Sequence, residues 1–186
     1  MNFFFEIVWI CWLLSEILLN RILLAKNNSG KNPDKYSLAI IWITICISIF
    51  LGVYFSMKVQ LKIINSDYLR ISGTLIILLG MLIRFVAIRT LGKFFTVNLN
   101  VRSDHKVIQH GFYKYLRHPA YTGSLLSFLG FGLSFNNWLS LLIVFVPVFL
   151  SMAYRISIEE KLLLETFGKE YEDYCIKTKR LLPFIF

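Results

Sequence analysis

The 186 residues are enough for one domain, and 56% of them are hydrophobic, with a mean hydropathy of +0.63. These values lie well above those of soluble globular chains and indicate an integral membrane protein. The net charge of +9 is scattered over segment ends and is not gathered into one stripe, which argues against a nucleic-acid partner and favours anionic lipid head groups. We therefore expect a single integral membrane domain over residues 1–186.

Five apolar runs predict an all-α, polytopic membrane protein with about five transmembrane helices. Their ranges are Phe3–Leu24, Ser37–Met57, Tyr68–Leu91, Tyr121–Phe135 and Trp138–Tyr154. The last two runs are joined by Asn136 and Asn137 and predict a helical hairpin. Each arm has only about 15 to 17 residues, so we expect the arms to tilt, to thin the bilayer, or to be shielded by the other helices.

A few polar and small residues inside these runs predict contacts between helices. Glu16 lies well inside the first run and should face protein or water, paired with a basic group such as Arg84 near the end of the third run. Gly73 and Gly80 in the third run are suited to close helix contact.

The stretch from Asp104 to Gly123, DHKVIQHGFYKYLRHPAYTG, places polar, aromatic and turn-forming residues between apolar segments. It contains all three histidines of the chain, His105, His110 and His118. This concentration predicts a binding site beside the membrane, whereas the alternative is a solvated loop with basic anchors. A metal site is disfavoured because no carboxylate or cysteine joins the histidines at ligand spacing.

From Arg155 onward the pattern changes to that of an amphipathic helix, which we expect to lie in the cytosol. One side of it carries residues spaced by three and four positions: Glu160, Leu164, Phe167, Tyr171 and Tyr174. The basic residues predict an outer N-terminus and a cytoplasmic C-terminus, although Lys58 and Lys62 argue mildly against this. The central stretch and the C-terminal helix should then emerge on the same side.

Two polar constellations would meet there. The first comprises His105-Lys106-Val107-Ile108, Gly111, Tyr113, Arg117-His118-Pro119-Ala120-Tyr121 and Gly123. The second comprises Arg155, Glu159-Glu160, Leu163, Phe167-Gly168, Tyr171 and Pro183-Phe184-Ile185. Over about the last 90 residues the chain resembles the isoprenylcysteine carboxyl methyltransferase family of integral membrane enzymes. Two long motifs in the same order and at the same separation are far more specific than one short motif.

This resemblance implies S-adenosylmethionine as the cofactor, bound by a portion of about residues 92–186, and implies no metal. Carried over residue by residue, the cofactor contacts are Asn98, His105, Lys106, Val107, Ile108, Tyr113, His118, Pro119, Ala120, Tyr121 and Glu159. Asn98 stands where relatives resembling the animal enzymes have a glutamine. Arg155 would meet the substrate. The chain departs from these enzymes in having fewer N-terminal spans and in Arg180, which replaces a small residue, and these departures concern the acceptor more than the cofactor.

The residues also suit methyl transfer on chemical grounds. An anionic acceptor needs mainly to be held in line with the methyl group, and the rings of Tyr113 and Tyr121 can face a sulfonium cation. Glu159 can accept hydrogen bonds from an ammonium or from ribose hydroxyls, and the planar fork of Arg155 fits a carboxylate. The plainer alternatives are that Arg155 and Glu159 form only an i, i+4 ion pair and that His118 caps the following helix.

The expected function is methyl transfer to a membrane-embedded acceptor, the first candidate being the carboxylate of a prenylated cysteine or a similar isoprenoid-tailed acid. Alternatives keep the cofactor and change the acceptor to a phospholipid amine, a small thiol or another lipid. A more distant alternative is an NADPH-dependent membrane reductase related to the sterol reductases. The expected location is the plasma membrane of a prokaryote or the endoplasmic reticulum of a eukaryote, with the site on the cytoplasmic side and the bilayer and a lipid-tailed substrate as partners.

Overall fold

The computed structural model describes residues 3–26, 36–66, 68–95 and 106–181, and within them the chain is helical, as predicted. The elements are α1 (Phe3–Lys26), α2 (Tyr36–Lys58), α3 (Tyr68–Leu91), η1 (Gly92–Phe94), η2 (Gly111–Lys114), α4 (Pro119–Ser134), α5 (Trp138–Phe167) and α6 (Lys169–Lys177). The starts and ends of the first three helices lie within about two residues of the predicted runs, because long apolar runs bounded by polar residues mark helix limits well.

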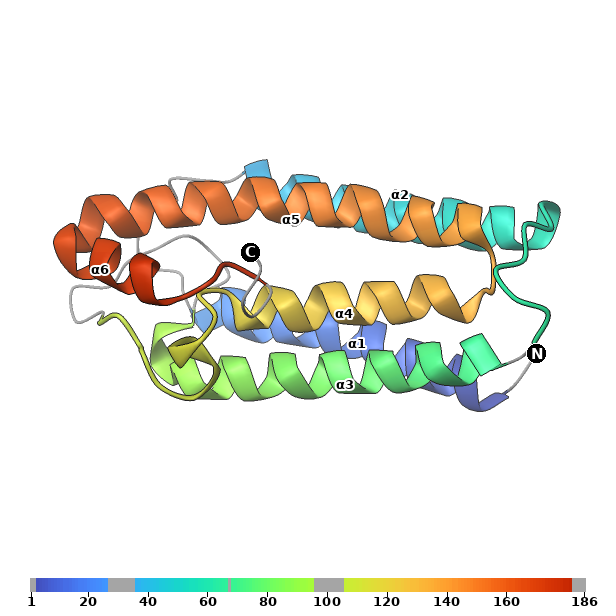
Figure 1. Cartoon of the computed structure of the whole chain (residues 1–186), viewed down its shortest axis with the longest axis horizontal. Helices are drawn as coiled ribbons and strands as arrows, with labels where there is room; N and C mark the ends of the chain where they lie inside the picture. The colour runs from blue at the N-terminus through green and yellow to red at the C-terminus, as the bar shows by residue number, and fades with distance from the viewer. Residues whose placement is uncertain (1–2, 27–35, 67, 96–105, 182–186) are drawn as a thin grey trace.

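The five long helices lie side by side along the long axis of the molecule (Figure 1). Helices α2 and α5 form one layer, and α1, α3 and α4 form the other. The short helix α6 lies at the end of the bundle where α5 finishes, together with residues 106–118 that lead into α4. The central stretch and the C-terminal segment therefore meet at one end, as the sequence predicted.

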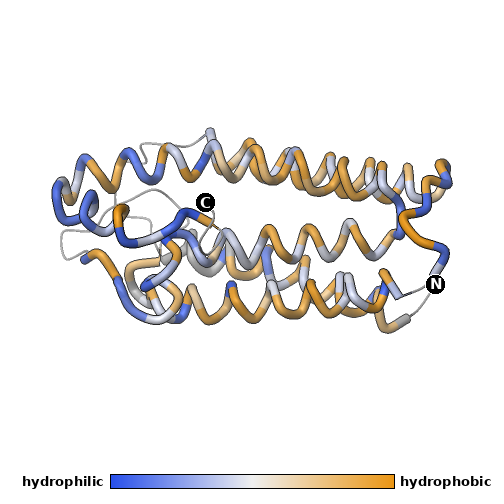
Figure 2. Tube along the Cα trace, viewed as in Figure 1, coloured by the Kyte–Doolittle hydropathy of each residue, from blue (hydrophilic) through white to orange (hydrophobic). Residues whose placement is uncertain are grey.

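Helices α2, α3 and α5 are long and apolar enough to cross a membrane by length and composition, among the residues described. Figure 2 shows hydrophobic residues along the middle of the bundle and hydrophilic residues gathered at its ends. The outward sides of these helices carry large exposed apolar residues, among them Ile43, Phe50, Leu75, Leu79, Leu82, Phe85, Leu142 and Leu150. Such an apolar exterior suits contact with lipid and not with water.

Helix α4 has 16 residues, most of them buried, because the other helices surround it. Shielding by neighbouring helices, one of the three outcomes expected for a short arm, thus describes α4. The predicted hairpin with α5 is present: Asn137 caps α5 by accepting a hydrogen bond from Ser140 N at 3.0 Å. Asn136 accepts hydrogen bonds from the backbone N–H groups of Ile63 and Ile64, which ties the hairpin turn to the segment before α3.

Small residues let α3 and α4 approach closely, as predicted for Gly73 and Gly80. A Cβ atom on Gly123 would lie 2.6 Å from the backbone nitrogen of Arg84 and 2.7 Å from the carbonyl oxygen of Gly80. A Cβ atom on Gly130 would lie 2.5 Å from the carbonyl oxygen of Gly73. The two backbones are therefore in contact along a seam that tolerates no side chain at these positions.

The pattern that changes at Arg155 lies on the same helix as the last predicted span. Helix α5 continues without a break for 30 residues and ends only at Gly168, whose φ of 52° lies in the left-handed region. The change from apolar to polar surroundings alters side chains but leaves the backbone helical, and glycine is the residue that permits such a φ at a helix end. Beyond it, Tyr171 and Tyr174 on α6 turn inward and are buried.

Candidate ligand-binding site

A cavity of about 190 Å³ lies within the bundle, at the end where residues 106–118 and α6 meet. Its polar and aromatic lining comes from every long helix, from α6 and from the central stretch, and includes Glu16, Trp42, Arg84, Lys106, Tyr113, Arg117, His118, Tyr121, Ser124, Arg155, Glu159, Tyr171 and Tyr174. Toward the middle of the bundle the same helices supply apolar walls, namely Leu13, Ile41, Ile45, Phe128 and Met152. The cavity thus joins a polar end to an apolar interior.

Most of the predicted site residues gather around this cavity. The lining includes nine of them: Lys106, Val107, Ile108, Tyr113, His118, Ala120, Tyr121, Arg155 and Glu159. Pro119 is buried as the first residue of α4 and does not line the cavity. Asn98 and His105 lie outside the described residues. His110 is exposed, in agreement with its lack of a matching family position.

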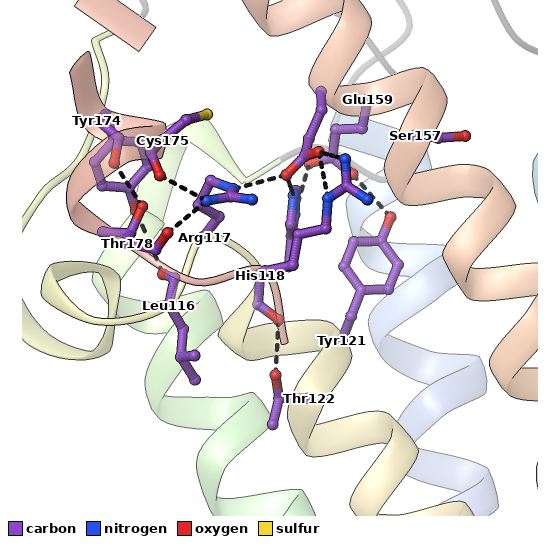
Figure 3. A network of polar contacts seen from close by, with 12 residues as sticks. Leu116, Arg117, His118, Tyr121, Thr122, Ser157, Glu159, Tyr174, Cys175 and Thr178 are labelled. Atoms are coloured by element: carbon purple, nitrogen blue, oxygen red, sulfur yellow. Dashed lines mark hydrogen bonds and ion pairs between the residues drawn. The ribbon is translucent and has the colours of Figure 1, made fainter. Parts of the chain in front are cut away.

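Arg155 is buried, with 3% of its surface exposed, and joins three helices. Its Nε donates a hydrogen bond to Tyr121 Oη at 3.0 Å, and its Nη1 donates to Ser37 Oγ at 2.7 Å. Tyr121 Oη in turn donates to Glu159 Oε2 at 2.9 Å, as the dashed line between their side chains shows (Figure 3). Arg155 and Glu159 are therefore linked through α4, which a plain i, i+4 ion pair would not require.

Glu160, the neighbour of Glu159, accepts hydrogen bonds from two arginines. Arg117 Nε lies 2.7 Å from Glu160 Oε1, and Arg180 Nε and Nη2 each lie 2.7 Å from Oε2. Arg117 Nη1 also donates to the carbonyl oxygens of Cys175 and Thr178, at 3.0 and 2.6 Å (Figure 3). Glu160 thus holds α5, the start of α4 and the chain after α6 together.

Backbone hydrogen bonds add to these side-chain contacts of Glu160. Arg117 N donates to Lys179 O at 2.7 Å, and Lys179 N donates to Tyr115 O at 3.0 Å. One turn into α4, Thr122 Oγ1 donates to Leu181 O at 2.7 Å. The segment after α6 is therefore fastened alongside the central stretch and the start of α4.

His118 occupies the N-cap position of α4 without a side-chain cap hydrogen bond, so the alternative that it caps this helix is wrong. Its ring instead lies between two carboxylates, with Nε2 3.3 Å from Glu160 Oε1 and Nδ1 4.0 Å from Glu159 Oε1. The ring is 4% exposed. His118 therefore positions the two neighbouring glutamates as much as it lines the cavity.

Several hydroxyl groups of the lining can serve a ligand. Tyr171 Oη and Ser124 Oγ are buried and have no hydrogen-bond partner among the residues described. Burial, followed by the negative charge of Glu159, raises the pKa of Tyr113; burial, followed by Glu160, raises the pKa of Tyr171. Both phenols therefore stay protonated. Because buried polar groups normally find partners, these groups suit a ligand that bears hydroxyl or charged groups.

Sequence reasoning left Glu160 and Arg117 without roles and did not find Ser37. Both Glu160 and Arg117 lie in the quoted motifs, so an arginine in the first motif and two adjacent carboxylates in the second were a usable signal for an ion pair. Ser37 lies 118 positions from Arg155, and its contact follows only from the packing of α2 against α5.

The geometry defines a helical membrane protein with a ligand cavity that residues of all five long helices and of the central stretch enclose. The sequence model of a family described as phospholipid methyltransferase matches residues 68–170, more than half of the chain. The chain belongs to this family. The match begins at α3, upstream of the portion recognised from the motifs, and ends at the start of α6.

Similar proteins carry more specific names. The chain is 36% identical over 115 residues to a probable protein-S-isoprenylcysteine O-methyltransferase of Oryza sativa subsp. indica, covering 61% of this chain and 60% of the relative. It is also 36% identical over 115 residues to protein-S-isoprenylcysteine O-methyltransferase of Saccharomyces cerevisiae, covering 61% of this chain and 48% of the relative. The chain thus spans about half to three fifths of the length of these relatives.

A solved structure of the eukaryotic intramembrane Ras methyltransferase ICMT, isoprenylcysteine carboxyl methyltransferase, superposes with a TM-score of 0.68. The match is 28% identical and covers 97% of this chain and 65% of that one. These relatives confirm the family resemblance predicted from the two motifs. Together with the long apolar helices, they identify the chain as an integral membrane protein.

Proposed function

We propose that this protein transfers a methyl group from S-adenosylmethionine to a membrane-embedded acceptor, namely the carboxylate of a prenylated cysteine or a similar isoprenoid-tailed acid. The observation that carries this proposal is the cavity, in which nine motif residues surround a polar end that continues into an apolar interior. The names of the rice and yeast relatives support the acceptor class.

The cavity residues fit the cofactor. When bound, S-adenosylmethionine supplies an electrophilic methyl group on a positively charged sulfur. Glu159, about a quarter exposed, would accept hydrogen bonds from hydroxyl or ammonium groups, and the rings of Tyr113 and Tyr121 would face the cation. Tyr171 Oη and Ser124 Oγ would gain the partners that they lack among the described residues.

The rest of the predicted cofactor set completes this assignment. It consists of Asn98, His105, Lys106, Val107, Ile108, His118, Pro119 and Ala120, within a cofactor-binding portion of about residues 92–186 of a single domain. Pro119 would act by starting α4, since it does not line the cavity. The segment after α6, which Glu160 joins to the start of α4, would help to exclude water from the polar end.

Arg155 would orient the acidic acceptor. Its guanidinium is held from two sides by Tyr121 and Ser37, at the boundary between the polar and apolar parts of the cavity. A planar fork in a fixed position suits a carboxylate, and most of the catalysis would be positioning. The acceptor tail would stay among apolar walls, which avoids exposing hydrocarbon to water at about 0.8 kcal/mol per CH₂.

The membrane placement is part of the proposal. Exposed aromatic residues lie near both ends of α2, at Tyr36 and Tyr54, and at the start and the middle of α5, at Trp138 and Tyr154. At a rise of about 1.5 Å per residue, these pairs are separated by about 27 and 24 Å, close to the hydrocarbon thickness of about 30 Å. We infer five spans, α1 to α5, with interfacial aromatic belts.

The orientation follows from charge. Among the described residues, the cavity end carries more lysines and arginines than the opposite end, where Lys58, Lys62 and Arg70 lie. The positive-inside rule then puts the cavity on the cytoplasmic side, with α6 and the last turns of α5 as the amphipathic cytosolic element. The membrane would be the plasma membrane of a prokaryote or the endoplasmic reticulum of a eukaryote.

A phospholipid amine is the second candidate acceptor, and the description of the matched family favours it. The two acceptors differ in what the enzyme must supply. A carboxylate reacts as the anion that Arg155 orients, whereas an ammonium head group must first lose a proton to a base. The buried guanidinium therefore favours the acid.

The proposed function is tested with purified protein in detergent and in lipid vesicles. Calorimetry should show binding of S-adenosylhomocysteine and none of NADPH. Isotopically labelled S-adenosylmethionine, offered with a prenylcysteine analogue, phosphatidylethanolamine and a thiol, should label the prenylcysteine, as read by mass spectrometry. Tight NADPH binding without a response to the sulfur ligand would overturn the proposal, and label on phosphatidylethanolamine alone would replace the acceptor.

A further inference from the structure

An ion pair lies in the wall of the cavity, outside both sequence motifs. Arg84 Nε on α3 lies 2.8 Å from Glu16 Oε1 on α1, and the two side chains are 20% and 15% exposed. This confirms the pairing predicted from the sequence. The Nε–H group is not aligned for a hydrogen bond to any described acceptor, so the contact is a charge pair only. Arg84 Nη1 donates to Ala120 O at 3.2 Å, which joins the pair to α4.

Packing does not require this pair. Helix α1 lies against α4 through ring contacts at centroid distances of 6.3, 5.9 and 4.8 Å, which join Phe5 with Phe135, Trp9 with Phe131, and Trp12 with Phe128. A buried ion pair is seldom more stabilising than apolar residues of the same size, and ionisable residues inside apolar helices usually serve function. The presence of Glu16 and Arg84 in the cavity wall therefore points to a ligand.

The same ring contacts give the register of α1 against α4, and this register identifies the α4 residue that faces the Glu16–Arg84 pair. Each step of three or four residues along α1 matches an equal step back along α4, so the next step places Glu16 opposite Ser124. Ser124 Oγ is buried, lines the cavity and has no hydrogen-bond partner in the described part of the chain. One carboxylate, one guanidinium and one unsatisfied hydroxyl thus share one part of the wall.

We propose that Glu16, Arg84 and Ser124 form the subsite for the amino-acid end of S-adenosylmethionine, an inference that rests on the proposed function. That end is a zwitterion, and Glu16 would meet its ammonium while Arg84 meets its carboxylate. An Arg–Glu pair has no net charge, so it matches a zwitterion better than it matches a simple acid. An isoprenoid tail offers nothing for these charges to bind.

The position of the pair agrees with this assignment. Arg84 bonds the carbonyl of Ala120, and it is near enough to Tyr113 to affect that phenol electrostatically. Both residues belong to the predicted cofactor set. Arg155, which bonds the hydroxyl of Tyr121, remains for the acidic acceptor. Glu159 then serves hydroxyl groups of the nucleoside.

The test compares two ligands that differ only at the amino-acid end. S-adenosylhomocysteine carries the zwitterion, whereas 5′-methylthioadenosine lacks it. The double variant Glu16→Gln/Arg84→Gln removes both charges together, so that neither is left buried alone, and Arg89→Gln on the exposed side of α3 is the control. Direct titration in detergent should show S-adenosylhomocysteine weakened about 10- to 100-fold in the double variant, with 5′-methylthioadenosine changed less than about twofold.

Other outcomes separate the failures. If the unaltered protein binds neither ligand, the proposed function fails first. If it binds S-adenosylhomocysteine and the double variant binds both ligands normally, or loses both equally while its melting temperature is retained, the subsite assignment is overturned. Unchanged ligand affinity with a raised KM for the prenylcysteine analogue overturns it too, because the pair would then serve the acceptor. The control variant should match the unaltered protein throughout.

Discussion

Helix α4 presents two faces that differ in what they allow. Toward α3 it shows Gly123, Ser127 and Gly130, and the two backbones touch. Toward the cavity it shows Tyr121 and Ser124, whose side chains reach open space or other helices. One face has no room for a methyl group, and the other borders a volume that a ligand can fill.

The difference indicates a division of labour within one helix. The seam sets the position of α4 with backbone-to-backbone contact, which leaves little freedom for sliding. The cavity face then carries groups whose positions matter for chemistry, such as Tyr121 between Arg155 and Glu159. A rigid seam behind a polar site is what holding reacting groups in line requires.

The largest expected effect distinguishes the two faces at adjacent residues. Gly123→Ala adds one methyl group at 2.6 Å from the backbone of α3, and both helices must move apart. We expect a loss of about 3 kcal/mol of stability, at the upper end of overpacking effects, and a melting temperature lower by about 6 to 12 °C. Ser124→Ala, one residue on, removes a hydroxyl without a partner among the described residues and should change stability little.

Thermal unfolding of both variants in the same detergent checks this expectation. Equal melting temperatures for Gly123→Ala and Ser124→Ala would mean that the contact between α3 and α4 relaxes easily. That result would contradict the proposal that the two faces of α4 have different roles.

The second prediction concerns Glu160, whose ion pairs with Arg117 and Arg180 hold the segment after α6 beside the start of α4. Glu160→Gln keeps the size of the side chain and removes the charge that Arg117 and Arg180 share. We expect the free energy of unfolding to fall by about 2 to 3 kcal/mol, the value of hydrogen bonds to a charged group. The loss should not be larger, because the oxygen of the glutamine amide still accepts one hydrogen bond. Limited proteolysis should cut within α6 faster than in the unaltered protein. Glu165→Gln, exposed on the same helix, is the control, and equal cleavage rates would show that backbone pairing alone holds the segment.

Much of this arrangement was predictable from residue type. Long apolar runs predicted the helices, and two charges in apolar surroundings predicted that Glu16 pairs with Arg84. Turn residues gave the hairpin at Asn137. The gathering of the two motifs at one end followed from the number of spans, because two helices, α4 and α5, lie between them and an even number of crossings returns the chain to the same end.

The rest depended on geometry that spacing does not contain. Helix α5 passes from apolar to polar surroundings with no break, so its end was predictable only from Gly168 and not from composition. Glu159 and Glu160 are chemically identical neighbours, and only their different directions give one to Tyr121 and the other to Arg117. Ser37 reaches Arg155 through the packing of two helices.

The third prediction tests the cavity face through its buried cation. Arg155→Lys keeps the charge and loses the planar fork that bonds Tyr121 and Ser37. We expect kcat/KM for an acidic acceptor to fall about thirtyfold, near 2 kcal/mol, while the Kd for S-adenosylhomocysteine changes less than about threefold. Steady-state kinetics and direct titration measure the two quantities, with Arg89→Lys on α3 as the control. Loss of cofactor affinity with normal acceptor kinetics would assign Arg155 to the cofactor.

The smallest expected effect is at Glu159. The side chain is 27% exposed, so a ligand gains less from its hydrogen bonds than from those of a fully buried carboxylate. Glu159→Ala should therefore weaken S-adenosylhomocysteine about tenfold, near 1.4 kcal/mol, while the melting temperature falls less than in Glu160→Gln. Calorimetric titration and thermal unfolding give the two numbers for each variant. The contrast between adjacent glutamates is decisive: if Glu159→Ala instead lowers the melting temperature more than Glu160→Gln and leaves ligand affinity unchanged, Glu159 serves only to hold Tyr121 in place.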